Sequence, residues 1–216
     1  MTIFDFRLAT QLVHGPGSIA RLPEFFSGKK KLLIVTDKGL VQAGVVDRVT
    51  AVLDRAGIPH SVFDGVLANP IASCVNAGHR QYTREKCDVI VGVGGGSPMD
   101  VAKMIGVLAA NGGRIDQYLI PSKVERDLPT LACVPTTYGT ASEVTPFAVL
   151  TDPQDQRHRT HGQGRDAERQ HHRQPAKNTP EGSGRNPQEG HLTGCSSPTL
   201  SLLDYTVKRF TFDKSI

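Results

Sequence analysis

The chain has 216 residues, of which 38% are hydrophobic and 6% aromatic, and its formal net charge is +4. This length suits one ordinary domain, alone or with a further segment. The 25 basic and 21 acidic residues are too nearly balanced to predict binding to nucleic acid or to an anionic membrane. No apolar run approaches the ~18 residues that a transmembrane helix requires.

The N-terminus and the cysteines indicate the compartment. The first residues, MTIFDFRLAT, lack the basic start and apolar stretch of a secretory signal. The four cysteines form no C-x-x-C pair and have no zinc-site spacing. We therefore expect a reducing, cytoplasmic setting.

Short apolar segments alternate with segments of helical periodicity up to about residue 151. Apolar runs predict strands at 31–36, 60–65, 88–93 and 128–135. Spacings of three or four residues predict helices at 39–56, 70–86 and 101–111. This alternation is typical of a parallel sheet covered on both faces, so we predict a doubly wound, mostly parallel α/β domain over residues 1–151.

The predicted strand at 88–93 leads directly into a glycine-rich turn, GVGGGSPMD. Ser97 is predicted to be the N-cap of the next helix, Pro98 suits the first helical position, and Asp100 suits a capping-box role. Such a turn presents backbone N–H groups at the positive end of a helix dipole, where a pyrophosphate often binds. The spacing is not G-x-G-x-x-G, so a tight turn that needs positive φ remains an alternative.

Two further stretches favour a dinucleotide as the ligand. Asp37 ends the first predicted strand, where a carboxylate can accept hydrogen bonds from ribose hydroxyls and repel a 2′-phosphate; it could equally be a helix N-cap. The loop after the strand at 128–135 contains a cluster of hydroxyls, at Thr136, Thr137, Thr140, Ser142 and Thr145. These could line cofactor phosphates or the nicotinamide ribose, although a turn-rich surface loop would have a similar composition.

The composition changes abruptly after residue 151. Between Asp152 and His191 only Ala167 and Ala176 belong to the apolar set. Ordering a chain costs roughly 1–2 kcal/mol of backbone entropy per residue, which such a segment cannot offset by burial. We therefore predict that residues 152–216 form a largely disordered tail, whose last 25 residues can supply one short strand or helix. An out-of-frame translation would explain the change, and the encoding DNA would decide this hypothesis.

The tail also contains five of the eight histidines. Without a scaffold and without carboxylates at fixed positions they do not predict a metal site. These residues are His158, His161, His171, His172 and His191.

The motifs of the first part of the chain resemble the N-terminal half of the iron-containing (group III) alcohol dehydrogenase family. GGGSPMD together with PTTYGTASEVT is specific for that family, whereas GGGS alone also suits glycerol dehydrogenases and dehydroquinate synthases. The matching stretches include HGPGSIARLPEFF, FDGVLANP and LPTLACVPTTYGTASEVTPFAVLTD, and the resemblance covers about residues 1–152. It implies an N-terminal domain that is dehydroquinate synthase-like and Rossmann-like. In this family a helical domain that holds Fe²⁺ or Zn²⁺ comes after it.

The resemblance also implies roles for the matching positions. Asp37 would contact the adenosine ribose and favour NAD over NADP, and Asn69 would lie near the cofactor. The pyrophosphate and the nicotinamide end would be bound by the glycine turn and by the threonine loop, which is the hydroxyl-rich loop after the predicted strand at 128–135. The predicted cofactor-binding set is Asp37, Asn69, Gly95, Gly96, Ser97, Asp100, Thr136, Thr137, Thr140 and Thr145. The family's metal ligands are one Asp and three His of the second domain, and no position here matches them, so neither metal ligands nor catalytic residues are predicted.

The reaction implied by the resemblance is the NAD(H)-dependent interconversion of a short-chain alcohol and its aldehyde or ketone. We expect this chain to be truncated and inactive by itself. One alternative is a non-catalytic nucleotide-binding fragment, and another is a maleylacetate-reductase-like enzyme, because PTTYGTASEVTP also suits that relative. The expected partner is a small alcohol or aldehyde, without nucleic acid or membrane, and a homo-oligomer is a further possible state.

Overall fold

A six-stranded sheet forms the centre of the protein in the computed structural model, which describes residues 10–119, 124–151, 158–161 and 207–210. The order of its strands is β1-β8-β5-β4-β2-β3. These strands are β1 (Thr10–Val13), β2 (Leu32–Val35), β3 (His60–Phe63), β4 (Val89–Gly94), β5 (Thr130–Pro135) and β8 (Val207–Phe210). The four strands β3, β2, β4 and β5 are parallel, whereas β8 is antiparallel to both β5 and β1. Beside the sheet, β6 (Ala148–Thr151) and β7 (His158–His161) form a separate antiparallel pair.

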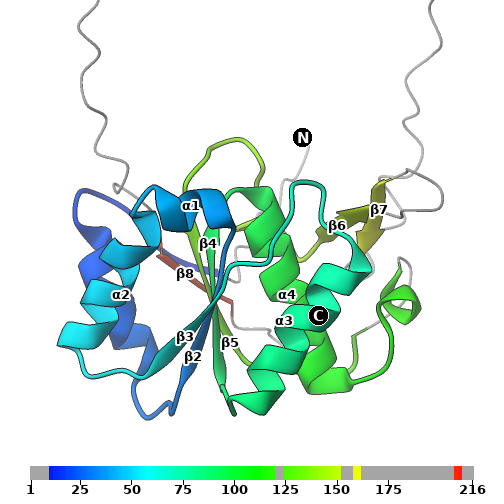
Figure 1. The fold of residues 1–216 in the computed structure, drawn as a ribbon, viewed down its shortest axis with the longest axis horizontal. Helices are drawn as coiled ribbons and strands as arrows, with labels where there is room; N and C mark the ends of the chain where they lie inside the picture. The colour runs from blue at the N-terminus through cyan, green and yellow to red at the C-terminus, as the bar shows by residue number, and fades with distance from the viewer. Residues whose placement is uncertain (1–9, 120–123, 152–157, 162–206, 211–216) are drawn as a thin grey trace, which may run out of the picture.

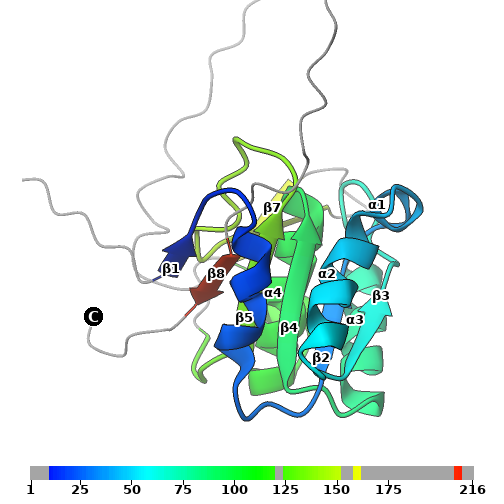
Figure 2. The ribbon, with the colours of Figure 1, turned by 90° about the vertical axis from the view of Figure 1, so that its left-hand side faces the viewer.

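Helices cover both faces of this sheet (Figures 1 and 2). One face packs against η1 (Ser18–Phe26) and α2 (Val45–Arg55), and the other against α3 (Ala72–Arg84) and α4 (Gly96–Asn111). Two short helices, α1 (Lys38–Gln42) and η2 (Ile115–Tyr118), complete the fold. Within the described residues, no helix is both long enough and apolar enough to span a membrane.

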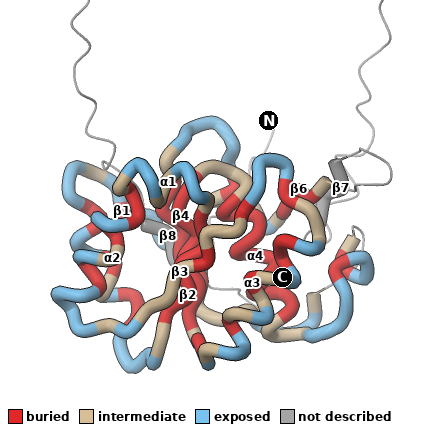
Figure 3. The backbone as a smooth tube through the Cα atoms, viewed as in Figure 1, coloured by how far each residue is buried: buried red, intermediate tan, exposed pale blue. Residues whose placement is uncertain are grey.

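Both faces of the central strands are buried, as Figure 3 shows for the interior of the molecule. In β2, Leu33 and Val35 pack into the core beneath α3 and α4, whereas Leu32 and Ile34 pack into the core beneath η1 and α2. Continuous apolar runs are the expected sequence of such strands, because neither face meets water. The structure therefore confirms the predicted doubly wound, mostly parallel α/β fold.

The structure contains four elements before residue 152 that were not predicted, β1, η1, η2 and β6, and the predicted helices differ from the observed ones at their boundaries. The single helix expected at 39–56 is divided into α1 and α2 at Gly44, whose φ is +69°. Glycine adopts this conformation without steric cost, so the chain can turn between the two helices. Of the predicted tail, β7 and β8 are described, and both are strands; the remaining tail residues lie outside the described part of the chain.

The contact between α3 and α4 is close at Gly78. A Cβ atom at Gly78 would lie 2.4 Å from Cδ1 of the fully buried Ile105 and 3.1 Å from Cε1 of Phe63. We expect Gly78→Ala to lower the free energy of unfolding by roughly 1–3 kcal/mol, because overpacking strains a dense core. Gly106→Ala in α4 is the matched control, since its Cβ would meet nothing closer than 3.6 Å. Gly106→Ala should raise the free energy of unfolding by up to about 1 kcal/mol. If urea unfolding showed that both variants change the free energy of unfolding in the same direction, this account of the packing would be contradicted.

A second interaction holds the amino-terminal ends of the parallel strands. Glu85 follows α3, and its Oε2 accepts a hydrogen bond from Nζ of Lys31 at 2.8 Å and another from the hydroxyl of Ser61. These bonds, that of Lys31 foremost, lower the pKa of Glu85 to about 2. A carboxyl with a lowered pKa stabilises the folded state above its ordinary pKa, and this contribution is lost as the pH falls through the lowered value.

We therefore expect Glu85→Gln to lower the free energy of unfolding by about 1 kcal/mol at neutral pH. The difference from the wild type should shrink as the pH falls from about 4.5 to about 2. Chemical unfolding at a series of pH values measures it. A difference that stayed constant across this range would show that the carboxylate charge is not the stabilising feature.

Candidate functional site

A cleft of about 660 Å³ opens at the carboxyl ends of the parallel strands. After β2 the chain forms β3 on one side and then crosses to form β4 on the other side, so the strand order reverses beside β2. In open α/β sheets, ligands bind at the carboxyl edge where this reversal occurs. The cleft is lined by the segments that follow β2, β3 and β4, which are residues 37–39, 64–68 and 95–98.

The glycine turn at the end of β4 forms one wall of the cleft. Gly94 has φ of +147°, and a Cβ there would lie 2.5 Å from Cγ of Pro98, so a side chain would be excluded. Gly95 is extended, with φ of −80° and ψ of −159°, and α4 begins at Gly96. The prediction that Ser97 caps this helix was wrong: Gly95 is the N-cap, with no side-chain bond. Three glycines allow the strand to enter the helix without a capping side chain.

This early start places two backbone donors at the cleft. The first N–H groups of a helix have no acceptor within the helix, and Gly96 and Ser97 occupy these positions in α4. Pro98, which follows them, has no N–H to donate. Gly95, Gly96 and Ser97 all line the cleft. The turn therefore offers N–H groups and the positive end of a 16-residue helix to an anion.

The threonine loop after β5 packs against the glycine turn. The N–H of Thr136 donates to the carbonyl of Gly94 at 2.8 Å. A Cβ on Gly95 would lie 3.0 Å from Oγ1 of Thr137, and a Cβ on Gly96 would lie 3.4 Å from Thr140. The structure therefore brings these three threonines beside the turn. The N–H of Thr145 instead donates to the carbonyl of Ala141 at 3.1 Å, within the loop itself.

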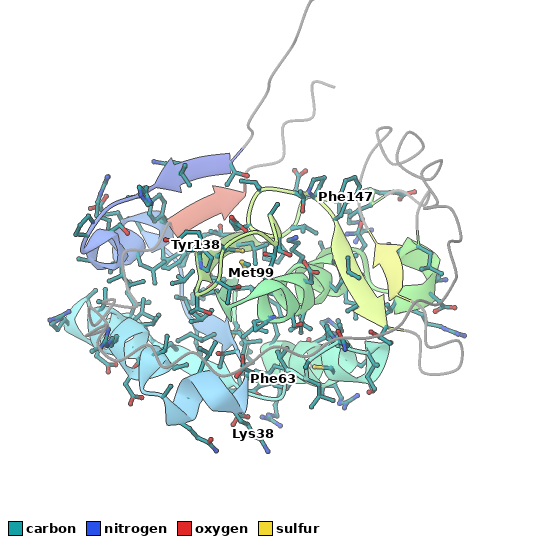
Figure 4. The ribbon with its side chains drawn as sticks, turned by 90° about the horizontal axis from the view of Figure 1, so that it is seen from above. Lys38, Phe63, Met99, Tyr138 and Phe147 are labelled. Carbon is teal, nitrogen blue, oxygen red and sulfur yellow. The ribbon has the colours of Figure 1, made fainter. Side chains whose placement is uncertain are left out.

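Asp37 also lines the cleft, two residues after the end of β2. Its Oδ1 accepts a hydrogen bond from the N–H of Leu40 at 3.0 Å, which caps α1. The capping alternative is confirmed, and a carboxylate has further acceptor sites for a ligand. Figure 4 views the molecule from above, with Lys38 of α1 and Tyr138 of the threonine loop labelled. Lys38, the residue after Asp37, is exposed and also lines the cleft.

Six of the ten predicted site residues lie outside the cleft lining, namely the four threonines of the threonine loop, Asn69 and Asp100. Asn69 is exposed, has φ of +54° and follows the lining segment 64–68 directly. Asp100 is only 5% exposed, and its carboxylate does not cap α4. It accepts hydrogen bonds from Nζ of Lys103 at 3.1 Å and from the N–H of Val149 at 2.9 Å. The predicted capping-box role of Asp100 is therefore wrong, because its carboxylate accepts hydrogen bonds from Lys103 and Val149 and not from the backbone at the start of α4.

Residues 38–39, 64–68 and 98 line the cleft but were not among the predicted site residues. A signal for the second segment was present, because an Asp-Gly pair follows the strand that ends at Phe63. The turns after adjacent parallel strands meet at one edge of the sheet. An Asp37–Gly65 bridge and a 3.2 Å bond from the N–H of Val66 to the carbonyl of Thr36 hold this segment beside the end of β2.

The donors and acceptors of the cleft fit a dinucleotide better than a metal ion. Backbone N–H groups suit phosphate oxygens, a carboxylate suits ribose hydroxyls, and the missing Cβ atoms of Gly95 and Gly96 leave no side chain between the turn and the threonine loop. The divalent metal implied by the resemblance finds no comparable fit. Within the described ranges, no group of three or more His, Cys, Asp or Glu residues could hold a metal ion.

Comparison with known proteins identifies the family of the chain. Residues 9–165 match the family model described as "Iron-containing alcohol dehydrogenase". The chain is 43% identical over 152 residues to a choline dehydrogenase of Bacillus subtilis, covering 68% of this chain and 38% of that protein. It is 43% identical over 154 residues to a 1,3-propanediol dehydrogenase of Klebsiella pneumoniae, covering 69% and 40%.

A solved structure agrees with this result. The sulfoacetaldehyde reductase of Bifidobacterium kashiwanohense, in complex with NAD⁺, superimposes with a TM-score of 0.69 at 25% identity, covering 76% of this chain and 44% of that one. The chain thus spans about two fifths of the length of the curated relatives it matches. On its matched sequence and its fold, the chain belongs to the iron-containing alcohol dehydrogenase family.

Proposed function

We propose that this chain binds NAD(H) in the cleft, as the dinucleotide-binding half of an enzyme that interconverts a short-chain alcohol and its aldehyde or ketone. The observation that carries the proposal is the glycine turn at the point where the strand order reverses, with Asp37 in the same cleft. The relatives of this chain include a 1,3-propanediol dehydrogenase, and one relative of known structure is bound to NAD⁺.

The glycine turn and Asp37 would bind different parts of the cofactor. The N–H groups of Gly96 and Ser97 would donate to the pyrophosphate, which the α4 dipole also attracts. Asp37 would accept hydrogen bonds from the adenosine ribose through an oxygen that does not cap α1. These contacts fix the cofactor at its phosphates and at one ribose. When bound, the nicotinamide supplies the hydride chemistry, which the protein supports by orienting the ring and excluding water.

The threonine loop would cover the phosphates and the nicotinamide end. Thr137 and Thr140 lie beside the glycine turn, and both are exposed. Asn69 would extend this lining beyond residues 64–68. The predicted cofactor role of Asp100 would be indirect, because both of its carboxylate oxygens bind groups of the protein.

A second candidate is a protein that binds the nucleotide without turning over an alcohol. It is favoured by the fact that the described residues hold no cluster of metal ligands. In this proposal residues 1–151 form the dinucleotide-binding domain, to whose sheet β8 adds a strand.

Calorimetric titration with NAD⁺ and NADH, beside an assay of alcohol-dependent NADH formation with added Fe²⁺ or Zn²⁺, separates the two candidates. Saturable binding with metal-dependent turnover would support the dehydrogenase. Binding without turnover would support the non-catalytic candidate. A chain that is folded by circular dichroism but binds neither nucleotide at millimolar concentration would refute both.

Asp37 provides a test of cofactor preference. We expect Asp37→Ser to shift the ratio of NADPH to NADH affinity at least tenfold toward NADPH, because the carboxylate that repels a 2′-phosphate is gone. Serine is chosen because it can still cap α1. Fluorescence titration with both reduced nucleotides measures the ratio. Asp47→Ser, which removes an exposed carboxylate from α2, should leave it unchanged; an unaltered ratio in Asp37→Ser would be evidence against the ribose contact.

A further inference from the structure

The structure contains a buried ion pair whose position suggests a role in the cleft. Lys103 is 4% exposed, the only buried lysine among the described residues, and Asp100 is 5% exposed. Both lie on α4, and their side chains are joined by a 3.1 Å hydrogen bond. Removing two charges from water is costly, and such a pair is tolerated only when its remaining donors and acceptors are also bonded.

The remaining groups of this pair bond the backbone on both sides of one residue. Lys103 Nζ donates to the carbonyl of Phe147, and Asp100 Oδ2 accepts from the N–H of Val149 at 2.9 Å. Between them stands Ala148, the first residue of β6. Figure 4 labels Phe147 beside the start of that strand. The pair therefore fixes the start of β6 against the helix whose N-terminus forms the glycine turn.

β6 is connected to both of the loops beside that turn. Upstream, residues 136–147 form the threonine loop, which packs against Gly95 and Gly96. Downstream, the N–H of Thr151 donates to the carbonyl of Pro70 at 2.8 Å, and Thr151 pairs with Ile71. Pro70 follows the cleft-lining segment 64–68 and Asn69. A single strand thus links two loops that are far apart in sequence.

Apolar packing alone would not fix this position. Ala148 and Leu150 are 1% and 2% exposed and lie in the core beneath α3 and α4, so burial already attaches β6 to the fold. Apolar contacts tolerate small shifts of a strand, whereas hydrogen bonds to two chosen backbone atoms do not. Buried polar groups can in this way fix one arrangement without adding stability.

We propose that Asp100 and Lys103 are positioning residues that act through β6 to hold the threonine loop and the 64–70 loop beside the glycine turn. The proposal deepens the assignment of NAD(H) binding, and its affinity readout rests on that assignment. A second readout, the amide hydrogen exchange of the two loops, does not depend on it.

The test replaces both members of the pair. A single substitution leaves an unpaired buried charge that can prevent folding, whereas the double variant Asp100→Leu/Lys103→Met has apolar groups of similar volume. We expect amide exchange at least tenfold faster in residues 136–147 and in residues 64–70, with α2 unchanged. NADH affinity, measured by fluorescence titration, should fall about tenfold.

Glu85→Gln is the matched control, because it removes an ion pair at the opposite edge of the sheet. It should leave loop exchange and NADH affinity at wild-type values. A folded double variant with wild-type exchange in either loop would overturn the proposal, and so would a double variant that does not fold, since the pair would then be a requirement of the fold. If the wild type binds no NADH, the proposed function fails, while the exchange result still decides the positioning role.

Discussion

The cleft depends on one backbone constraint, which is that β4 must become α4 within the three residues Gly94–Gly96. Gly94 has a φ that side chains rarely allow, and a Cβ would lie 3.0 Å from Oγ1 of Thr137 at Gly95 and 3.3 Å from Oγ of Ser142 at Gly96. The same absence of side chains gives the turn its tightness, its exposed N–H groups and its contact with the threonine loop. The tight-turn explanation and the anion-binding explanation are therefore compatible, because one geometry produces both.

The amino ends and the carboxyl ends of the parallel strands differ in how their polar groups are used. At the amino ends, the carboxylate of Asp88 accepts hydrogen bonds at 3.0 Å from the N–H groups of Lys30 and Lys31, and Glu85 binds Lys31 and Ser61. At the carboxyl ends, the turns leave N–H groups and the Asp37 carboxylate facing a cleft. Polar groups that satisfy one another stabilise the amino ends, whereas groups at the carboxyl ends stay available to a ligand. Substitutions at the amino ends can therefore change stability without changing the cleft.

The sequence was sufficient to predict the fold and the wall of the cleft at 95–97, because both follow from local patterns. Apolar runs identify buried strands, and glycines after a strand identify the turn. The role of Asp100 could not be predicted in this way, since spacing from Ser97 indicated a cap, while its actual partners include a backbone N–H that is 49 residues away. The segment 64–68 was missed for a related reason, because its place in the cleft depends on strand order. Contacts between segments that are distant in sequence are determined by tertiary packing, and local periodicity carries no information about them.

The polar part of the chain shows a limit of arguments from composition. A segment without apolar residues cannot form a core, yet a strand needs only a partner for its backbone N–H and C=O groups, which nearly every residue carries. His158–His161 pairs with β6 in this way, and Val207–Phe210 lies between β5 and β1. Because β1 is hydrogen-bonded in the sheet only to β8, residues 10–13 join the sheet through residues 207–210. Residues 207–210 belong to the last 25 residues of the chain, for which the sequence allowed one short strand or helix, and the position of the first strand depends on their backbone bonds.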